Sequence, residues 1–356
     1  DAKSIHRLLG AGAMIDGKPV AGFEHNGDNP LETDVIILDE MSMVDIFVFR
    51  SLLRAVVPGT RLILVGDADQ LPSVGPGAVL KDVIDSGCFH VTRLTRIYRQ
   101  AEASSIVRNA HAIIEGRSIA LDAKDEDFFF LERHDAERII QGMVYLVEKK
   151  LPEHMGCSPF DIQIMTPMRK GVLGVENLNL RLQEAMNPPG RMKRELGTSN
   201  GILRTGDKVM QIKNDYDLEW TVSNGRGMVL ETGTGVFNGD IGRILSVSSD
   251  KAYVRFDDGR KAEYKGETLS ELELAYAITI HKSQGSEYMA VLLPLLQGPR
   301  MLMNRNLLYT AVTRAKQMVC ILGSKNTVEE MISNEREENR HTGLERRIRE
   351  MAGAGT

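Results

Sequence analysis

Short runs of apolar residues, each followed at once by polar residues, recur along the chain. Residues 35–38 read Val-Ile-Ile-Leu and are followed by Asp39 and Glu40, and residues 62–65 run into a stretch rich in Gly and Pro. Runs this short fit strands that are buried on both faces of a parallel sheet. Between them, residues 46–56 have the apolar spacing of a helix. The order strand, helix, strand predicts a βαβ unit whose polar loops follow the carboxyl ends of the strands, where α/β sheets place ligands.

The second half of the chain repeats this alternation of short apolar runs and helical segments. Its predicted strands are 162–166, 273–280, 288–293 and 318–322, and its predicted helices are 174–187 and 304–316. Residues 206–213 also have the pattern of a strand. Residues 235–265 differ, because short alternating strands are separated there by Gly-Asp and Asp-Gly turns, which predicts a small inserted β-barrel. The predicted fold class is therefore α/β, with parallel sheets and one β-barrel insertion.

Three further segments have less specific patterns. Residues 10–30 are rich in Gly and predict a loop or a small hairpin, with Asp16-Gly17 as its turn. Residues 218–234 read as extra sequence before the barrel, without an assigned role. Residues 329–349 are rich in charge and predict a helical tail with a solvated face.

Composition limits the class of protein. A length of 356 residues predicts two or three domains. The net charge of −5 argues against a uniformly basic nucleic-acid binder, although Lys and Arg can still cluster on one face. The three cysteines, Cys88, Cys157 and Cys320, form no metal-binding pattern and indicate free thiols in a reducing compartment. No apolar run reaches membrane-spanning length and no signal peptide is recognisable, so we expect a cytoplasmic protein without a membrane partner.

The polar residues after the first two strands have the chemistry of a nucleotide hydrolase. In such enzymes an Asp holds the Mg²⁺ shell, and a Glu positions and deprotonates the attacking water, which are the roles open to Asp39 and Glu40. Gln70 has both a donor and an acceptor and can sense a terminal phosphate from the neighbouring strand. The alternative is that Asp39 and Glu40 end a strand in a solvated turn, and that residues 66–77 form an ordinary surface loop.

Six blocks in this order resemble the RecD-like branch of superfamily 1 DNA helicases, the exodeoxyribonuclease V alpha-subunit family. The blocks are Ser4–Leu9, Asp39-Glu40, Gly66–Gly77, Tyr98–Gln100, His281–Glu287 and Tyr309–Arg314. Each block is weak alone, but their order and spacing are specific, and the Gly66–Gly77 loop is close to diagnostic. The resemblance covers nearly the whole chain.

The resemblance implies two RecA-like lobes, with ATP between them and single-stranded DNA across their tops. Residues 1–103 would form the first lobe, with a pin-like insertion at about 10–30. Residues 104–356 would form the second lobe, with an SH3-like barrel insertion at about 235–265. It also implies ATP-dependent 5′-to-3′ translocation and duplex unwinding, with ATP and Mg²⁺ as cofactors. The implied partners are single-stranded DNA, junctions of single- and double-stranded DNA, and recombination or repair subunits.

The resemblance further implies roles for individual residues. The catalytic residues would be Asp39, Glu40, Gln70, Arg99 and Arg314, with Asp39 as the Mg²⁺ ligand and the two arginines as arginine fingers. The residues facing the nucleotide from the second lobe would be Gly285 and Glu287. The residues near the DNA would be His6, Pro72, Ser73, Val74, His281 and Lys282. For the two histidines the alternative is a satisfied polar residue near a core, and for Lys282 it is a solvated cation.

The chain departs from this family in two respects, of which residues 218–234 are the second and an absent motif is the larger. No Gly-x-x-x-x-Gly-Lys-Ser/Thr phosphate loop occurs in the 356 residues. In the family this loop lies upstream of the Ser4–Leu9 block, so we expect the chain to be a fragment that by itself binds ATP poorly and hydrolyses it negligibly. Two alternatives stay open: the helicase lobe of a conjugative relaxase or of an exonuclease complex, and a non-catalytic DNA-binding or docking module.

Overall fold

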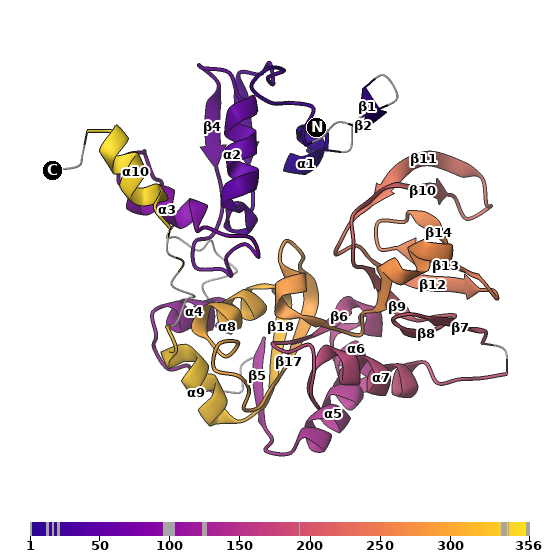
Figure 1. The fold of residues 1–356 in the computed structure, drawn as a ribbon. Helices are drawn as coiled ribbons and strands as arrows, with labels where there is room; N and C mark the ends of the chain where they lie inside the picture. Colours follow the sequence, from indigo (N-terminus) through magenta and orange to yellow (C-terminus); the bar gives the residue numbers. More distant parts are fainter. Residues whose placement is uncertain are drawn as a thin grey trace. The chain divides into compact units, whose positions relative to one another are not determined.

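The computed structural model describes residues 2–11, 14–15, 18–19, 22–94, 104–122, 127–191, 193–335, 340 and 342–353. The chain forms two compact units (Figure 1), which we call unit 1 (Asp1–Tyr98 with Glu335–Thr356) and unit 2 (Arg99–Asn334). Both chain ends belong to unit 1, so the chain passes between the units twice. The sequence placed all of residues 104–356 in the second lobe, whereas the C-terminal residues fold against unit 1 through contacts that no local pattern reveals.

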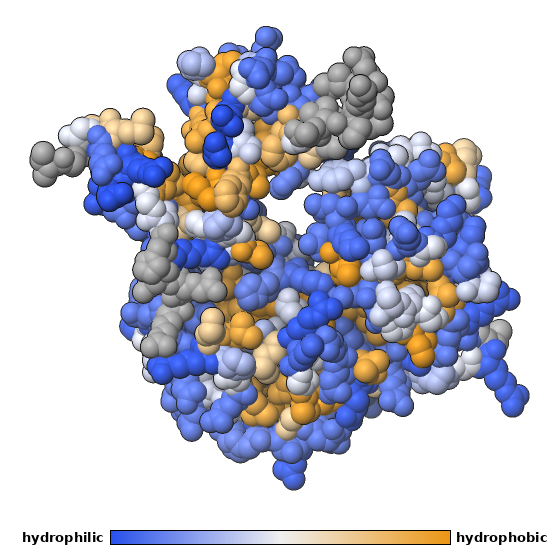
Figure 2. Space-filling view, in the orientation of Figure 1, coloured by the Kyte–Doolittle hydropathy of each residue, from blue (hydrophilic) through white to orange (hydrophobic). Residues whose placement is uncertain are grey.

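Unit 1 contains the predicted βαβ unit. Strand β3 (Val35–Leu38) pairs in parallel with β4 (Arg61–Leu64), and α2 (Ile46–Ala55) connects them. Ile36 and Leu38 of β3 are buried in a core with α2, whereas Val35 and Ile37 are 46% and 66% exposed. Figure 2 shows apolar side chains on the surface over α2 and β4. The prediction that β3 is buried on both faces is therefore wrong for the described residues, because only one face of the strand pair is covered.

Smaller elements complete unit 1. They are α1 (Ile5–Leu8), a 3-10 turn at Met41–Met43, α3 (Val79–Asp85) and α10 (Leu344–Met351). Within residues 10–30, β1 (Met14–Ile15) and β2 (Lys18–Pro19) pair antiparallel, which confirms the small hairpin. The predicted Asp16-Gly17 turn lies outside the described residues.

Unit 2 is built on a parallel sheet of five strands in the order β16-β6-β17-β18-β5. The strands are β5 (Phe128–Glu132), β6 (Ile162–Thr166), β16 (Ala277–Thr279), β17 (Tyr288–Leu295) and β18 (Ala315–Gly323). The helices are α4 (Ser105–Ile114), α5 (Ala136–Tyr145), α6 (Leu151–Met155), α7 (Val175–Met186), α8 (Arg305–Thr313) and α9 (Lys325–Ser333). Helices α5 and α7 pack on the face that carries Ile162, Ile164 and Leu292. Helices α4, α8 and α9 gather separately from them (Figure 1). Nearly every residue of β6 and β17 is buried, as expected for strands covered on both faces.

The inserted β domain is larger than the sequence predicted. A short hairpin of β7 (Glu195–Thr198) and β8 (Gly201–Arg204) precedes it. Seven strands pair antiparallel in the order β11-β10-β14-β13-β12-β9-β15. They are β9 (Lys208–Gln211), β10 (Asp215–Ser223), β11 (Val229–Val236), β12 (Ile241–Val247), β13 (Lys251–Phe256), β14 (Lys261–Lys265) and β15 (Leu272–Leu274). Residues 218–234, read as extra sequence, form most of the β10–β11 hairpin. Strand β9 is fully buried, like β6 of the parallel sheet, so its apolar Val209 and Met210 do not by themselves assign it to the insertion.

The predicted strand 273–280 is two strands that belong to two different sheets. Strand β15 pairs with β9 of the insertion, and β16 pairs with β6 of the parallel sheet. Between them the buried Gln163 side chain donates to the carbonyl oxygens of Ala275 (3.1 Å) and Tyr276 (3.3 Å). The chain therefore changes sheets without leaving the core. None of the helices in the described part of the chain is long and apolar enough to cross a membrane.

Candidate functional site

The first group of candidate residues lies at the carboxyl edge of β3 and β4 in unit 1. The backbone pairing continues beyond the strands: the Val65 amide donates to the Leu38 carbonyl (2.8 Å), and the Met41 amide donates to the Val65 carbonyl (3.0 Å). Asp39 and Glu40 are therefore beside the start of the Gly66 loop. This proximity is what the order of elements predicts.

Glu40 has an unusual backbone conformation. Its φ of 54° and ψ of 41° are left-handed, and no other described residue except glycines has a positive φ. The Asp39 carboxylate accepts a hydrogen bond from the Glu40 amide (2.8 Å), which holds the two residues in this turn. Left-handed backbone is unfavourable for a residue with a side chain, and such positions concentrate at functional sites.

Gly66 allows this close approach of the two strand ends. A Cβ atom at this position would lie 2.9 Å from the Met41 amide nitrogen and 3.0 Å from Leu80 Cδ2. Further along the loop, the Gln70 side-chain amide donates to the Asp67 carboxylate (3.2 Å). The loop thus has an internal contact that orients Gln70 relative to its own turn.

The Ser73–Gly77 part of the loop packs on the N-terminus of α2. Asp45 caps this helix and accepts from the amides of Phe47 (2.8 Å) and Val48 (2.9 Å). The Ile46 amide donates to the Pro76 carbonyl (3.0 Å). Ser73 is buried, whereas the Val74 side chain is 90% exposed. The loop therefore has a fixed base and presents one apolar side chain to solvent.

Gly75 provides a test of this packing. A Cβ atom there would lie 2.3 Å from Asp45 Oδ2, in the side chain that caps α2. We expect Gly75→Ala to lower the free energy of unfolding by about 1–3 kcal/mol, because either the loop or the cap must shift. Gly27→Ala is the matched control in unit 1, since its Cβ would meet only the Arg54 carbonyl at 3.8 Å. Chemical denaturation of both variants measures the effect, and equal stability would contradict the predicted clash.

The second group lies at the amino edge of the parallel sheet in unit 2. Gly285 and Glu287 precede β17, and Arg314 precedes β18. The Tyr288 amide donates to the Arg314 carbonyl (2.9 Å), and the Arg314 guanidinium donates to the Ser286 carbonyl (3.4 Å). Gly285 has a left-handed φ of 75°. Arg314 is only 6% exposed, so its charged group is fixed within this edge.

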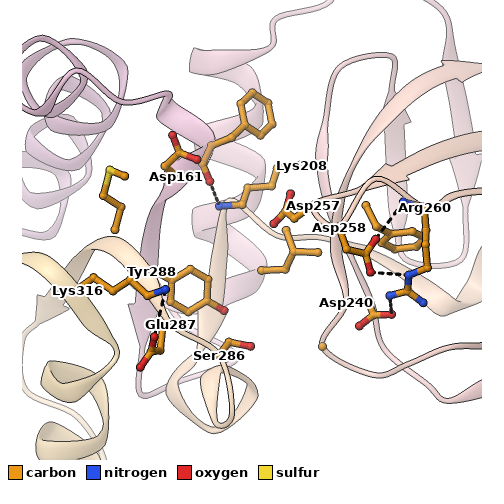
Figure 3. A pocket seen from close by; sticks show the side chains of 15 residues that line it. Asp161, Lys208, Asp240, Asp257, Asp258, Arg260, Ser286, Glu287, Tyr288 and Lys316 are labelled. Atoms are coloured by element: carbon orange, nitrogen blue, oxygen red, sulfur yellow. Dashed lines mark hydrogen bonds and ion pairs between the residues drawn. The ribbon is translucent and has the colours of Figure 1, made fainter. Parts of the chain in front are cut away.

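A cavity of about 480 Å³ adjoins this edge and the inserted β domain (Figure 3). Its lining includes Glu287, Lys316, Lys208, Asp257 and Arg260. Lys316 pairs with Glu287 (3.2 Å). The cavity is therefore lined by opposite charges from both parts of unit 2.

Lys208 is the most deeply buried charge in this lining. Its ammonium group donates to the carbonyl oxygens of Phe160 (2.8 Å) and Ile162 (3.2 Å), and so links β9 to the start of β6. Burial lowers the pKa of Lys208 to about 8, although the charges of Asp257 and Asp161 oppose this change.

The lowered pKa of Lys208 predicts a pH dependence of stability. The unfolded chain keeps this proton up to about pH 10.5, whereas the folded chain loses it near pH 8. Between these values the unfolded state binds more protons, so the free energy of unfolding rises with pH. Relative to Lys208→Met, we expect the wild type to gain roughly 2 kcal/mol between about pH 7 and 9.5. Urea unfolding of both proteins across this range measures it, and parallel pH profiles would contradict the prediction.

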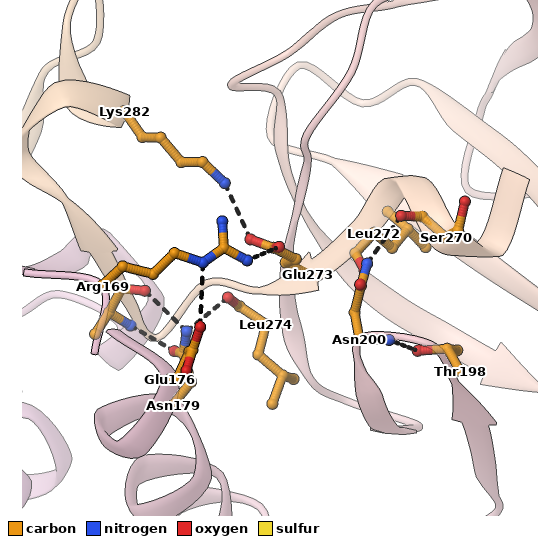
Figure 4. Close-up of polar contacts among 11 residues, drawn as sticks. Arg169, Glu176, Asn179, Thr198, Asn200, Ser270, Leu272, Glu273, Leu274 and Lys282 are labelled. Carbon is orange, nitrogen blue, oxygen red and sulfur yellow. Dashed lines mark hydrogen bonds and ion pairs between the residues drawn. The ribbon is translucent and has the colours of Figure 1, made fainter. Parts of the chain in front are cut away.

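The third group lies at the opposite, carboxyl edge of the same parallel sheet (Figure 4). Lys282, in the 3-10 turn after β16, pairs with Glu273 (3.0 Å). Arg169, after β6, pairs with both Glu273 (2.8 Å) and Glu176 (3.2 Å). Burial disfavours ionisation of Glu273, but the hydrogen bond and charge of Lys282, with the charge of Arg169, outweigh it and lower the pKa of this carboxyl group. Two cations are thus held by two carboxylates.

The structure separates the candidate residues of unit 2 into two groups. His281 and Lys282 lie at the carboxyl edge of the sheet, and Gly285, Glu287 and Arg314 lie at its amino edge, although residues 281–287 are continuous in sequence. In unit 1, His6 is exposed on α1, with its ring 5.7 Å from that of Phe23. Arg99 lies outside the described residues.

Sequence reasoning missed two residues in these groups. Glu273 reads as one residue of a predicted strand, and Lys208 as one residue of another. No motif marks either of them: Glu273 is 104 positions from Arg169, and Lys208 is 46 positions from Ile162, so these pairs are set by tertiary packing. For Mg²⁺, the described residues contain no cluster of three or more His, Cys, Asp or Glu side chains. The Asp39 carboxylate fits this cation, which prefers oxygen ligands and is commonly held by one or two carboxylates together with phosphates and waters.

Three family profiles match the chain. They are an AAA domain over residues 1–134, an ATP-dependent RecD-like DNA helicase SH3 domain over residues 178–256, and a UvrD-like helicase C-terminal domain over residues 274–322. The SH3 match includes β9 to β13 and agrees with the larger β insertion. A crystal structure of a Pif1 helicase from Bacteroides with ADP-AlF3 and single-stranded DNA aligns with a TM-score of 0.53 and 18% identity, covering 94% of this chain and 80% of that one. The chain thus shares its fold with this Pif1 helicase, and the predicted α/β class with an SH3-like insertion is confirmed.

Two curated proteins of similar sequence show to which kind of helicase the chain is related. The ATP-dependent RecD2 DNA helicase of Deinococcus radiodurans is 36% identical over 98% of this chain and 43% of its own length. The RecBCD enzyme subunit RecD of Mycolicibacterium smegmatis is 32% identical over 98% of this chain and 59% of its own length. The chain therefore spans about half the length of these curated relatives. It carries RecD-like helicase domains and is a homologue of RecD2 and RecD, which confirms the resemblance.

Proposed function

We propose that this chain is the motor portion of an ATP-dependent 5′-to-3′ DNA helicase, which couples ATP hydrolysis to translocation on single-stranded DNA and to duplex unwinding. One observation carries the proposal: in a RecD2 homologue, Asp39 and Glu40 lie beside the Gly66 loop at the carboxyl edge of two paired parallel strands. A carboxylate pair and a phosphate-sensing loop at one sheet edge are the parts that nucleotide hydrolysis requires.

In this proposal each candidate residue acts through its own chemistry. Asp39 binds Mg²⁺, and Glu40 orients the attacking water and accepts its proton. Gln70 contacts the terminal phosphate. Arg99 and Arg314 stabilise the charge that develops on the transferred phosphoryl group, since a planar guanidinium binds two oxygens at once. ATP supplies the phosphoanhydride bond that is cleaved.

The remaining candidates contact nucleotide or DNA. Gly285 and Glu287 contribute to nucleotide binding. The proposed DNA-contacting residues are His6, Pro72, Ser73, Val74, His281 and Lys282. The substrates are single-stranded DNA and its junctions with duplex.

The experiment measures ATP hydrolysis stimulated by single-stranded DNA, on this chain and on the whole protein that contains it. It also measures displacement of a strand from duplexes with a 5′ or a 3′ single-stranded tail. We expect stimulated hydrolysis by the whole protein and displacement only from the 5′-tailed duplex. Displacement only from the 3′-tailed duplex would contradict the polarity. An absence of stimulation would favour a non-catalytic docking module.

The homology to RecD favours a second candidate, a helicase subunit of a recombination or repair complex related to RecBCD. In that case the whole protein would be isolated with further subunits. Affinity purification from its native cell tests this candidate, and recovery of the protein alone would favour a stand-alone helicase.

Lys282 allows a test of the DNA contacts. We expect Lys282→Met to weaken binding of single-stranded DNA by about tenfold. The slope of log affinity against log salt concentration should fall by about one, because one phosphate contact is lost. Conversely, Glu273→Gln removes the carboxylate that holds Lys282 and Arg169, and is expected to tighten binding. Fluorescence anisotropy over a salt series measures both variants. Lys150→Met removes an exposed lysine elsewhere in unit 2 and is the control. Unchanged binding by Lys282→Met would contradict the contact.

A further inference from the structure

Arg340 and residues 342–351 pack within unit 1 against earlier parts of the chain, although the sequence predicts only a helical tail with a solvated face. Helix α10 packs on α3, and the partly buried Leu344 packs against the core of unit 1. The Thr342 hydroxyl donates to the buried Asp82 carboxylate (2.5 Å). The Arg349 guanidinium donates to the Asp85 carbonyl (2.6 Å) at the end of α3. These contacts hold the segment against the part of the chain that directly follows the Gly66–Gly77 loop.

Arg340 begins this segment and binds the loop itself. Its Nη1 donates to the Gly77 carbonyl (2.8 Å), the Ser73 hydroxyl (3.3 Å) and the Gly75 carbonyl (2.5 Å). Its Nη2 donates to the Ser73 carbonyl (2.5 Å). One half-buried guanidinium thus contacts four oxygen atoms from three loop residues that lie more than 260 positions earlier in the chain. The planar, multi-donor guanidinium suits this task, because a lysine ammonium cannot span acceptors on both sides of a turn.

These contacts determine the shape of the exposed part of the loop. Val74 lies between Ser73 and Gly75, so the backbone on both sides of it is held by Arg340. A surface loop of Gly, Pro and Ser without such contacts would sample several conformations, and binding a ligand would require it to be ordered first. Arg340 orders the loop in advance.

We propose that Arg340 is a positioning residue for DNA binding, which acts by holding the Ser73–Gly77 loop in the conformation that contacts single-stranded DNA. The inference rests on the proposed function, because it assigns the loop to the DNA. In this role the Nη1 and Nη2 donors of Arg340 bind loop oxygens, and the loop rather than the guanidinium contacts the DNA. The docked segment 342–351 serves as the anchor that keeps Arg340 in place.

The experiment compares Arg340→Met and Arg340→Lys with the wild-type chain in binding of a fluorescent oligothymidylate over a salt series. We expect both variants to lose about tenfold in affinity, with an unchanged slope of log affinity against log salt concentration. A lost phosphate contact would instead reduce the slope by about one. Hydrogen exchange of the loop amides, measured without DNA, should be faster in both variants. Arg346→Met is the matched control, because Arg346 lies on α10, is largely exposed and pairs with Glu350 on the same helix (3.5 Å).

The outcomes separate this inference from the proposed function. A wild-type chain that does not bind single-stranded DNA would contradict the proposed function, and the exchange rates would still test whether Arg340 orders the loop. Wild-type affinity in Arg340→Lys would overturn the inference, since charge alone would then suffice. A reduced salt slope would also overturn it, in favour of a direct phosphate contact. Unchanged affinity together with a lower melting temperature would assign Arg340 a purely structural role.

Discussion

Replacement of Glu40 by Gln is expected to lower the kcat of DNA-stimulated ATP hydrolysis by about 10²–10⁴-fold, the usual contribution of a general base. Glutamine keeps the size and hydrogen bonding of the side chain but cannot accept the proton of the attacking water. Glutamine and glutamate have the same penalty for the left-handed backbone at position 40, so the backbone strain is the same in the variant and in the wild type. The measurement is steady-state hydrolysis by the whole protein that contains this chain, at saturating single-stranded DNA.

Glu32→Gln is the matched control for this variant. Glu32 is an exposed carboxylate that precedes β3, at the end of the strand opposite to Glu40. We expect its kcat to equal that of the wild type, and we expect both variants to bind single-stranded DNA normally. A Glu40→Gln protein with wild-type kcat would show that Glu40 does not activate water, and would leave its strained conformation without a catalytic explanation.

Replacement of Arg314 by Lys is expected to lower kcat by about 10³–10⁵-fold, the range for loss of an arginine finger. Lysine keeps the positive charge but lacks the planar fork that binds two phosphate oxygens. Arg314 is almost fully buried, and its carbonyl pairs with the Tyr288 amide, so the structure holds it in one position. The measurement is again hydrolysis at saturating DNA, together with the melting temperature of each protein.

Two comparisons make the Arg314 result interpretable. Arg300→Lys changes an exposed arginine of the same unit and should leave kcat unchanged. If Arg314→Lys lowers the melting temperature but keeps kcat within a few-fold of the wild type, the contact with the Ser286 carbonyl is structural and Arg314 does not act on phosphate. A loss of kcat at an unchanged melting temperature supports the proposed role.

The paired charges at the carboxyl edge of the unit 2 sheet bear on how DNA would bind there. Lys282 and Arg169 share Glu273, and Arg169 also pairs with Glu176, so the formal charges of these four groups sum to zero. If DNA binds here as proposed, its phosphate would have to compete with a carboxylate for Lys282. Such competition would lower affinity while fixing the position of the cation, which would favour transient contacts over tight static binding.

Local pattern was sufficient for much of the fold. The alternation of short apolar runs and amphipathic segments predicted the β3-α2-β4 unit and the buried strands β6, β17 and β18, because burial of a strand or of one helix face imposes a periodicity on neighbouring residues. The polar residues directly after β3 and β4 could be predicted to lie together, because parallel strands bring their carboxyl ends to one edge of the sheet.

Only the tertiary structure decided which partners meet across long stretches of chain. It assigned β9 to the inserted domain, divided 273–280 between two sheets, and paired Glu273 with Arg169 across 104 positions. It also returned the C-terminal segment to unit 1 and placed Arg340 on the Ser73–Gly77 loop. A single arginine or glutamate carries no periodic signal, and its partner is selected by packing of whole elements. The sequence by itself therefore determined the elements and the chemistry at their ends, and the three-dimensional packing determined which side chains hold that chemistry in place.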